Sequence, residues 1–350
     1  MKFDSELDES YRLPGIPERR KGEAQWSDRL DDWLALRKVP PRAESGQVRA
    51  GRTAELSLRA RLGRHESTRF GEIFGGKRVP RAPGQRAGRY EIDLIVITPR
   101  RLHVIEVKNW SGRLSLDGAQ WVHERSNGER LVHPNLATYN QAKAQTLSRY
   151  LVSHGTAVPS PRIAQTVVFT NQRLQTDRAI EEHPNIVTAQ QLERYIRQQR
   201  GASRWAYAFS ALIQACADAD NACKLADGLF DLMPPLMVDG ARAAIAELRT
   251  WDRLQLHGGR ELIGDLLWIH NRDGRLAAEA FASATAYTLR WRRGMLGILP
   301  LMGWGSFGHM HDRQTGWRPV AVNDCVYFHE AGQAQPAVIA LRAVDRIEIG

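Results

Sequence analysis

The chain has 350 residues, of which 43% are hydrophobic and 25% charged, so its length allows two or three folding units with substantial cores. This composition excludes a disordered tail protein. The most apolar run, Met295 to Trp304, is short and interrupted by glycine and proline, and the start from Met1 to Arg20 is too polar for a secretory signal. With three cysteines and no CxxC pair, we expect no membrane span and a reducing, cytoplasmic location.

The basic excess lies mainly in one part of the chain. Lys and Arg number 49 against 39 Asp and Glu, which gives a net charge of +10. The stretch from Arg49 to Arg113 alone holds fifteen basic and six acidic residues, an excess of +9. Such a stretch attracts a polyanion, and nucleic acid is the expected partner. A solvated, arginine-rich surface is the alternative interpretation.

The N-terminal part is predicted to begin with an arm over residues 1–45 that holds one helix, Glu23–Arg37, with its apolar residues on one stripe. A second helix is expected over Gly51–Leu62, with Glu55 near its start. A basic loop, Lys77–Arg89, follows and contains two prolines and no acidic residue. We expect this loop to be mobile until it is bound.

The next residues predict the core of a domain over residues 46–200. Strands over Glu91–Thr98 and Leu102–Lys108, separated by three residues, predict a hairpin, and a third strand is expected over Arg113–Glu124. The pattern then predicts a helix over Leu136–Leu151, a buried strand over Arg162–Thr170, a short strand over Ile186–Thr188, and a helix that Thr188–Gln191 caps.

Beyond Gly201 the composition changes. Alanine-rich helices are expected over Trp205–Met233 and Asp239–Leu254, in a helical segment spanning residues 201–257. Short alternating segments with many glycines then predict a small antiparallel β domain over residues 258–350. Its expected strand segments are Leu262–His270, Leu276–Arg292, Trp317–Phe328 and Ala337–Ile349.

Three ionisable residues stand out in the predicted hairpin. Side chains alternate across a strand, so Glu106 and Lys108 share one face. If Ile97 pairs with Leu102, Asp93 lies opposite Glu106; if the register moves by two residues, Asp93 lies opposite Lys108. Both registers place the three groups on one face, and an intermediate register would separate them.

Two neighbouring carboxylates repel each other, and burial raises that cost, so the pair is expected to need a cation. Mg²⁺, with Mn²⁺ as a substitute, suits Asp93, Glu106 and the backbone carbonyl of Val107 as ligands. Such an ion can polarise a phosphodiester and activate water, while Lys108 positions the water or balances charge. The predicted reaction is phosphodiester hydrolysis. A structural ion pair on a half-exposed strand is the alternative interpretation.

The same residues resemble a known family. The strand Ile92–Asp93, the strand from Val104 to Trp110, and Ser111–Gly112 leading to Trp121 are similar to the nuclease-related domain (NERD), a branch of the PD-(D/E)XK nuclease superfamily. The resemblance covers roughly residues 51–155. It implies an α/β fold with a restriction-endonuclease-like core, whose mixed central sheet is flanked by helices. The helical segment and the small antiparallel β domain would follow that core.

The resemblance implies roles for single residues. Asp93 and Glu106 match the family's metal ligands, and Lys108 matches its catalytic lysine. Glu55 matches the acidic residue of the first helix, although a glutamate in a first helical turn is also favoured by the helix dipole. Gln141 is a looser match to an auxiliary glutamine, with Gln145 as a competitor.

The leading hypothesis is therefore a Mg²⁺-dependent nuclease that acts on DNA. Its basic loop would clamp phosphates through Lys77, Arg78, Arg81, Arg86 and Arg89. The C-terminal half would recognise substrate, bind a partner protein or form a homodimer. The alternative is a catalytically silent module that holds nucleic acid for a separate enzyme. Endonuclease or exonuclease action, and a role in DNA repair or in defence against foreign DNA, stay open.

Overall fold

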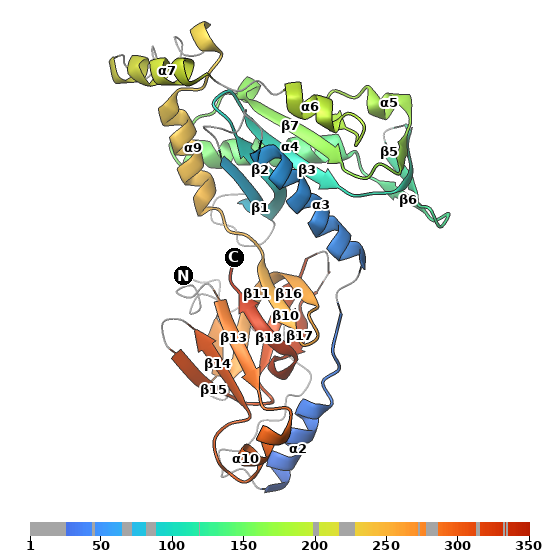
Figure 1. The fold of residues 1–350 in the computed structure, drawn as a ribbon, viewed down its shortest axis with the longest axis vertical. Helices are drawn as coiled ribbons and strands as arrows, with labels where there is room; N and C mark the ends of the chain where they lie inside the picture. The colour runs from blue at the N-terminus through green and yellow to red at the C-terminus, as the bar shows by residue number, and fades with distance from the viewer. Residues whose placement is uncertain are drawn as a thin grey trace.

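The computed structural model describes residues 26–43, 46–64, 72–81, 89–118, 120–198, 203–216, 228–271, 274–277, 286–312, 316–331, 333 and 335–350. These residues form two stacked units, an α/β unit and a β-rich unit (Figure 1). The predicted α/β class, with a mixed sheet between helices and a C-terminal antiparallel sheet, is confirmed. Within the described ranges, every helix is too short or too polar to cross a membrane.

A five-stranded mixed sheet forms the centre of the α/β unit. Its strands, in spatial order, are β1 (Glu72–Pro80), β2 (Arg89–Ile97), β3 (Leu102–Lys108), β7 (Ile163–Phe169) and β9 (Ile186–Val187). The first three are antiparallel neighbours, and β7 and β9 run parallel to β3. Ile97 lies opposite Leu102 and Leu94 opposite Ile105. This is the first of the two registers that place Asp93, Glu106 and Lys108 on one face.

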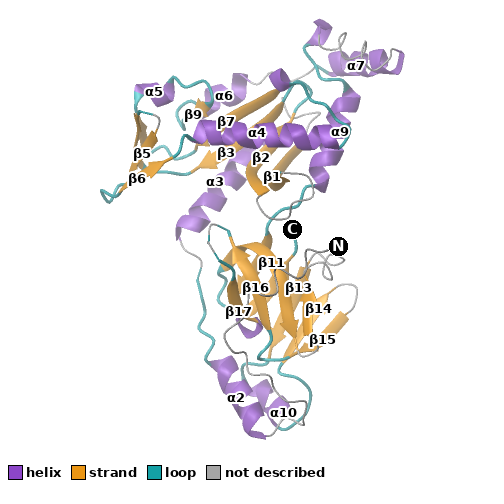
Figure 2. Ribbon diagram, turned by 180° about the vertical axis from the view of Figure 1, so that it is seen from behind, coloured by secondary structure: helices purple, strands orange, loops and turns teal. Residues whose placement is uncertain are grey.

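Helices cover both faces of this central sheet. On one face lie α4 (Leu136–Ser153) and α9 (Pro235–Glu247), and Figure 2 shows α4 across the strands. On the other lie α3 (Gly46–Gly63) and α6 (Leu192–Gln198). Because alternate residues of β3 face opposite helices, Val104 and Ile105 are both buried. This explains why the strand is apolar at nearly every position.

The single strand predicted over Arg113–Glu124 is wrong. The chain turns at Gly118, whose φ of +60° suits glycine, and two strands of a separate four-stranded sheet result. In spatial order this small sheet consists of β6 (Arg130–His133), β5 (Gln120–Glu124), β4 (Gly112–Asp117) and β8 (Leu174–Thr176). Its inner face packs Leu114 and Trp121 with Phe169. Short elements near it are η2 (Ser160–Arg162) and α5 (Arg178–Glu181).

The helical segment differs from the prediction. Helix α7 spans Arg204–Cys216, and the rest of the long helix expected there falls largely on residues 217–227, outside the described ranges. Helix α9 begins at Pro235 rather than Asp239, because proline fits a first helical turn. It ends at Glu247 rather than Leu254, because the next residues enter a strand of the β-rich unit. The buried side of α9 packs against the central sheet.

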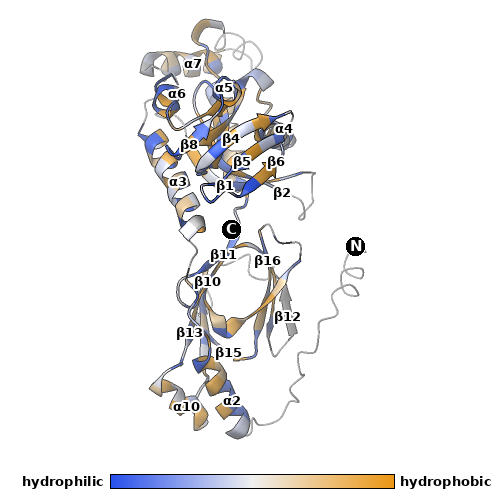
Figure 3. Cartoon of the chain, turned by 90° about the vertical axis from the view of Figure 1, so that its right-hand side faces the viewer, coloured by the Kyte–Doolittle hydropathy of each residue, from blue (hydrophilic) through white to orange (hydrophobic). Residues whose placement is uncertain are grey.

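The β-rich unit is a curved antiparallel sheet (Figure 3). Its nine strands are β10 (Asp252–Leu256), β11 (Glu261–Asn271), β12 (Gly274–Ala277), β13 (Ala286–Trp291), β14 (Gly308–Asp312), β15 (Gly316–Val320), β16 (Cys325–Glu330), β17 (Ala337–Ala340) and β18 (Val344–Glu348). Its short helices are η4 (Met295–Gly297), α10 (Ile298–Leu301) and η5 (Leu341–Ala343). Leu254, Phe328 and Ile347 are fully buried in its core. The sequence patterns missed β10 and β14.

The helix expected in the N-terminal arm is present as α2 (Trp26–Arg37). It packs on the β-rich unit, where Leu36 is buried with Phe307 and Val322. The chain then returns to the α/β unit through α3. The two units are therefore connected twice along the chain, before α3 and after α9 (Figure 1).

Candidate functional site

The hairpin register brings Asp93 to Glu106 at the point where β2 and β3 separate. The last cross-strand pair on this side is Leu94 with Ile105, and one further step places Asp93 opposite Glu106. At that step the Asp93 carboxylate accepts a 2.7 Å hydrogen bond from the backbone N–H of Val107. A side chain thus satisfies a buried N–H that the hairpin leaves unpaired. The predicted register with Ile97 opposite Leu102 is confirmed.

Glu106 lies between two lysines. One carboxylate oxygen is 2.6 Å from the Lys108 ammonium, and the other is 2.5 Å from the Lys143 ammonium. Glu106 and Lys143 are 6% and 4% exposed, so this second ion pair is isolated from water. The Lys108 side chain is 26% exposed, so the ion pair of Lys108 with Glu106 is closer to solvent than that of Lys143.

Lys143 is the functional candidate that the sequence patterns missed. It lies on α4, one turn beyond Asn140, whose side-chain amide donates to the Val104 and Thr166 carbonyls at 3.2 Å. Both residues interrupt the apolar stripe of Leu136, Leu147 and Leu151. A pair of polar residues on the apolar side of a helix predicts a buried contact, and this signal could have identified Lys143.

The acids and lysines influence one another's protonation. Burial, followed by the charge of Glu106, raises the pKa of Asp93 to about 8. Burial also opposes the charged form of Glu106, but Lys108 and Lys143 outweigh it and lower the Glu106 pKa. Burial alone would lower the pKa of Lys108, whereas the adjacent carboxylates raise it. Lys108 is therefore a cation at neutral pH and suits the stabilisation of negative charge.

Glu55 approaches this cluster from α3. The helix begins at Gly46, so the prediction that Glu55 lies near its start is wrong and the helix-dipole explanation no longer applies. Burial, and then the charges of Glu91 and Glu106, raise the pKa of Glu55, while Lys108 lowers it. Arg253 of β10 also lowers this pKa, so the β-rich unit lies within electrostatic range.

The donor atoms fit a hard divalent ion. Mg²⁺ is typically held by one or two carboxylates, with water and substrate oxygens completing its octahedron. Asp93 and Glu106 supply two carboxylates beside the Val107 backbone. Among the described residues no group of three His, Cys, Asp or Glu side chains is close enough to form an all-protein cage. Burial and then the charge of Glu106 raise the Asp93 pKa, and a cation between the acids would offset that charge.

The residues after Lys108 attach the small sheet to the site. Trp110 stacks on both His123 and His133, whose ring centroids lie 4.6 and 4.5 Å from its own. Gly112 has a φ of +97°, and a Cβ there would lie 2.1 Å from the Glu124 carbonyl oxygen. Glycine is therefore required at this position, which accounts for Gly112 after Trp110 and Ser111.

The predicted basic loop is wrong for Lys77 and Arg78, which lie in β1. The Lys77 ammonium donates to two carbonyls at the end of α9, Ala246 at 3.0 Å and Leu248 at 2.6 Å. Arg78 is 4% exposed, pairs with Asp265 of β11, and stacks 3.5 Å from the Trp251 ring centroid. Both cations join elements of the protein, and this engages Lys77 and Arg78 in internal contacts.

The other candidates of that loop differ in position. Arg81 is exposed beside the Tyr90 ring, 4.2 Å from its centroid, and Arg89 opens β2. Arg86 lies outside the described residues. Gln141 is exposed on α4, while Lys143 of the same helix contacts Glu106. A role for Gln141 stays a prediction.

The site combines two acids and two lysines at the end of a hairpin in a mixed α/β unit. Residues 50–170 match the family model of the nuclease-related domain, NERD, which confirms the resemblance for this part of the chain.

One similar relative is a probable kinase, PglW, of Streptomyces coelicolor. It is 27% identical over 108 residues, which cover 31% of this chain and 7% of that protein. This chain therefore spans only a small part of that relative's length. No solved structure matches the chain.

Proposed function

We propose that this protein is a metal-dependent nuclease that hydrolyses phosphodiester bonds, with DNA as its substrate and Mg²⁺ or Mn²⁺ as its ion. The observation that carries the proposal is the buried pair of Asp93 and Glu106 with Lys108 beside them. The match to the nuclease-related domain supports it. We further propose that the central sheet and its helices form a restriction-endonuclease-like core.

Each group of the site has a distinct task under this proposal. The Asp93 and Glu106 carboxylates and the Val107 carbonyl would hold the ion, which supplies polarisation of the phosphodiester and a more acidic water. Lys143 is buried and holds one Glu106 oxygen, so it fixes the carboxylate. Lys108 can leave the other oxygen because its side chain is partly exposed. Its charge then stabilises the negative phosphoryl oxygens.

Glu55 would act as a proton acceptor. Its raised pKa makes it a better proton acceptor at neutral pH than an ordinary glutamate. Its location on α3, within the electrostatic reach of Lys108 and Glu106, supports a role beside the attacked phosphate.

One observation favours a second candidate, the catalytically silent nucleic-acid-binding module. Both oxygens of Glu106 are taken by lysine ammonium groups, so the protein supplies its own cations to this carboxylate. If the two lysines stay in place, they exclude a divalent ion from Glu106, and the domain would bind DNA without cutting it for a partner enzyme.

The test compares the purified protein with Lys108→Met and Asp93→Asn on supercoiled, linear and single-stranded DNA, with Mg²⁺, Mn²⁺ or EDTA. Lys38→Met is the matched control, because Lys38 is exposed just beyond α2. We expect strand cleavage with either metal by the wild type and the control, and none with EDTA or by the site variants. Undiminished cleavage by Lys108→Met refutes the proposal. DNA binding without cleavage by the wild type supports the silent module.

A further inference from the structure

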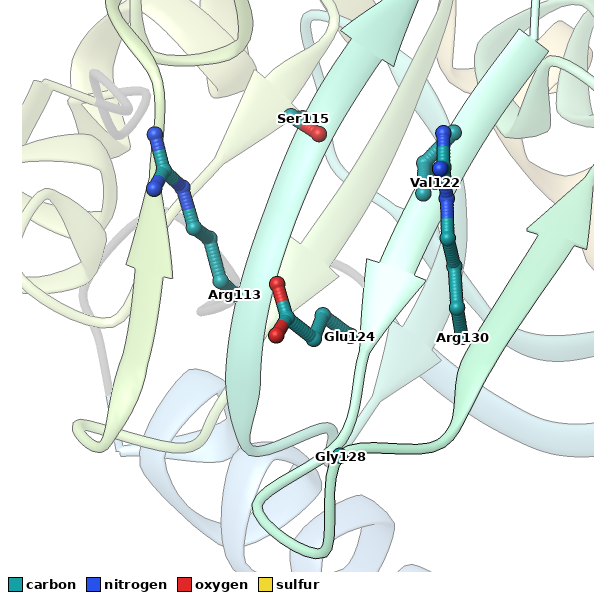
Figure 4. Close-up of a pocket in the computed structure, with 6 residues that line it drawn as sticks. All are labelled: Arg113, Ser115, Val122, Glu124, Gly128 and Arg130. Atoms are coloured by element: carbon teal, nitrogen blue, oxygen red, sulfur yellow. The ribbon is translucent and has the colours of Figure 1, made fainter.

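The outer face of the small sheet carries an arginine-lined hollow. Leu114 and Trp121 point to the inner face, so their strand neighbours point outward. The register places Arg113 opposite Glu124, and Glu124 opposite Arg130, in one row across β4, β5 and β6. Figure 4 shows Arg113 and Arg130 extending on either side of the Glu124 carboxylate.

Two adjoining hollows share this row. The first has a volume of about 430 Å³ and is lined by Arg113, Ser115, Val122, Glu124, Gly128 and Arg130. The second has a volume of about 420 Å³, shares Arg113 and Glu124, and adds Arg125 and Arg173. Four arginines against one glutamate give the combined lining a positive charge. We call Arg113, Arg125, Arg130 and Arg173 the arginine surface.

Arg113, Arg130 and Arg173 are exposed, whereas Arg125 is partly exposed and pairs with Glu129 at 2.8 Å, with side chains 41% and 45% exposed. Within the described ranges, no ion pair joins Arg113 or Arg173 to an acidic side chain, and both residues are exposed. Arg130 contacts Asp117 at 3.3 Å, but the two side chains are 64% and 73% exposed, so water weakens that pair. The situation is the reverse of that of Arg78, which is buried against Asp265.

The arginine surface is also close to the acids. Gly112 lines the second hollow and follows Lys108 by four residues, which span at most about 14 Å. His133 lies within electrostatic range of both Lys108 at the site and Arg125 of the arginine surface. Burial, and then the charges of His123, Lys108 and Arg125, lower the His133 pKa, so Lys108 and Arg125 act on the same imidazole.

We propose that the arginine surface binds the phosphate backbone of the DNA strand that extends from the site of Asp93 and Glu106. The inference rests on the proposed nuclease function and names the surface that holds its substrate. Guanidinium groups bind phosphates through paired N–H donors, and such contacts position DNA without selecting its sequence. Glu124 lies among the arginines and opposes the phosphates, so it limits the affinity of the surface.

The experiment measures binding of fluorescently labelled DNA by anisotropy in EDTA, where cleavage does not occur, at several salt concentrations. The variants are Arg113→Gln, the triple variant Arg113→Gln with Arg130→Gln and Arg173→Gln, and Glu124→Gln. Arg197→Gln, an exposed arginine of α6, is the matched control. Because all these side chains are exposed, thermal unfolding of each variant should equal that of the wild type.

We expect Arg113→Gln to weaken binding by about 5- to 10-fold and to reduce the salt slope by about one. The triple variant should lose about 100-fold or more, and its slope should fall by two to three. Glu124→Gln should tighten binding, which mere loss of surface structure would not produce, and the control should leave binding unchanged.

The outcomes separate this inference from the nuclease proposal. If the wild type cuts DNA with Mg²⁺ but the triple variant binds with unchanged affinity and slope, the arginine surface is refuted and the nuclease proposal stands. If the triple variant loses binding but the wild type never cuts DNA, the surface stands and the nuclease proposal fails. If the wild type does not bind DNA at all, the proposal that the arginine surface binds DNA is refuted.

Discussion

The replacement Asp93→Asn should make the metal-free protein more stable while it removes activity. In the wild type, burial and the charge of Glu106 raise the Asp93 pKa from 3.8 to about 8. The folded state therefore keeps a proton that the unfolded chain releases above pH 4. Between these two pKa values the free energy of unfolding falls by at most about 1.4 kcal/mol per pH unit as the pH rises. The summed loss at pH 7 is about 4 kcal/mol. Asparagine carries no charge and can still accept the Val107 N–H bond.

The assay is urea unfolding in EDTA at several pH values from 5 to 8.5, followed by circular dichroism. We expect a stability gain for Asp93→Asn of between about 1 and 4 kcal/mol at pH 7, smaller at pH 5, together with complete loss of cleavage. Mg²⁺ should stabilise the wild type and leave the variant unchanged. A variant that is less stable than the wild type at pH 8, or that shows no pH-dependent difference, refutes the raised Asp93 pKa that burial and the charge of Glu106 produce.

Three further predictions concern the same core. Lys143→Met should lower the free energy of unfolding by about 1–3 kcal/mol, because Glu106 keeps only its Lys108 partner, and denaturant titration beside Lys38→Met measures it. His103→Leu should make the free energy of unfolding depend less on pH below pH 6.5. Burial lowers the His103 pKa from 6.5 to about 4, so its contribution of at most ~3 kcal/mol is present above pH 6.5 and is lost as the pH falls through 4; equal acid sensitivity in both proteins would contradict this. The increase in melting temperature with Mg²⁺ should be larger at pH 8 than at pH 6, because the Asp93 proton must leave before the carboxylate binds the ion. An increase independent of pH would contradict the role of Asp93 as a metal ligand.

The sequence predicted much of the α/β unit, because its signals are local. The hairpin of β2 and β3 follows from two apolar runs and a short turn, and their alternation places Glu106 and Lys108 on one face. The small sheet was harder to predict. A turn at Gly118 divides the expected strand, and β4 pairs with β8, which lies far along the chain.

Long-range contacts explain the other differences. The run Lys77–Arg89 is basic and contains prolines, so it resembles a solvated loop in isolation. Arg78 is nevertheless buried, because Asp265 and Trp251 of the β-rich unit provide an ion pair and a ring contact. No local pattern encodes partners that are more than 170 residues away.

The sequence by itself determined the chemistry that is available: two acids and a lysine at strand spacing, within a strongly basic stretch. The tertiary structure alone decided which charges meet. It selected the register that joins Asp93 to Glu106, and it buried Lys143 against the same carboxylate. It also committed Lys77 and Arg78 to internal contacts while it left Arg113 exposed. The physical reason is that burial and distance set the strength of a charge interaction, and both arise only when distant segments pack together.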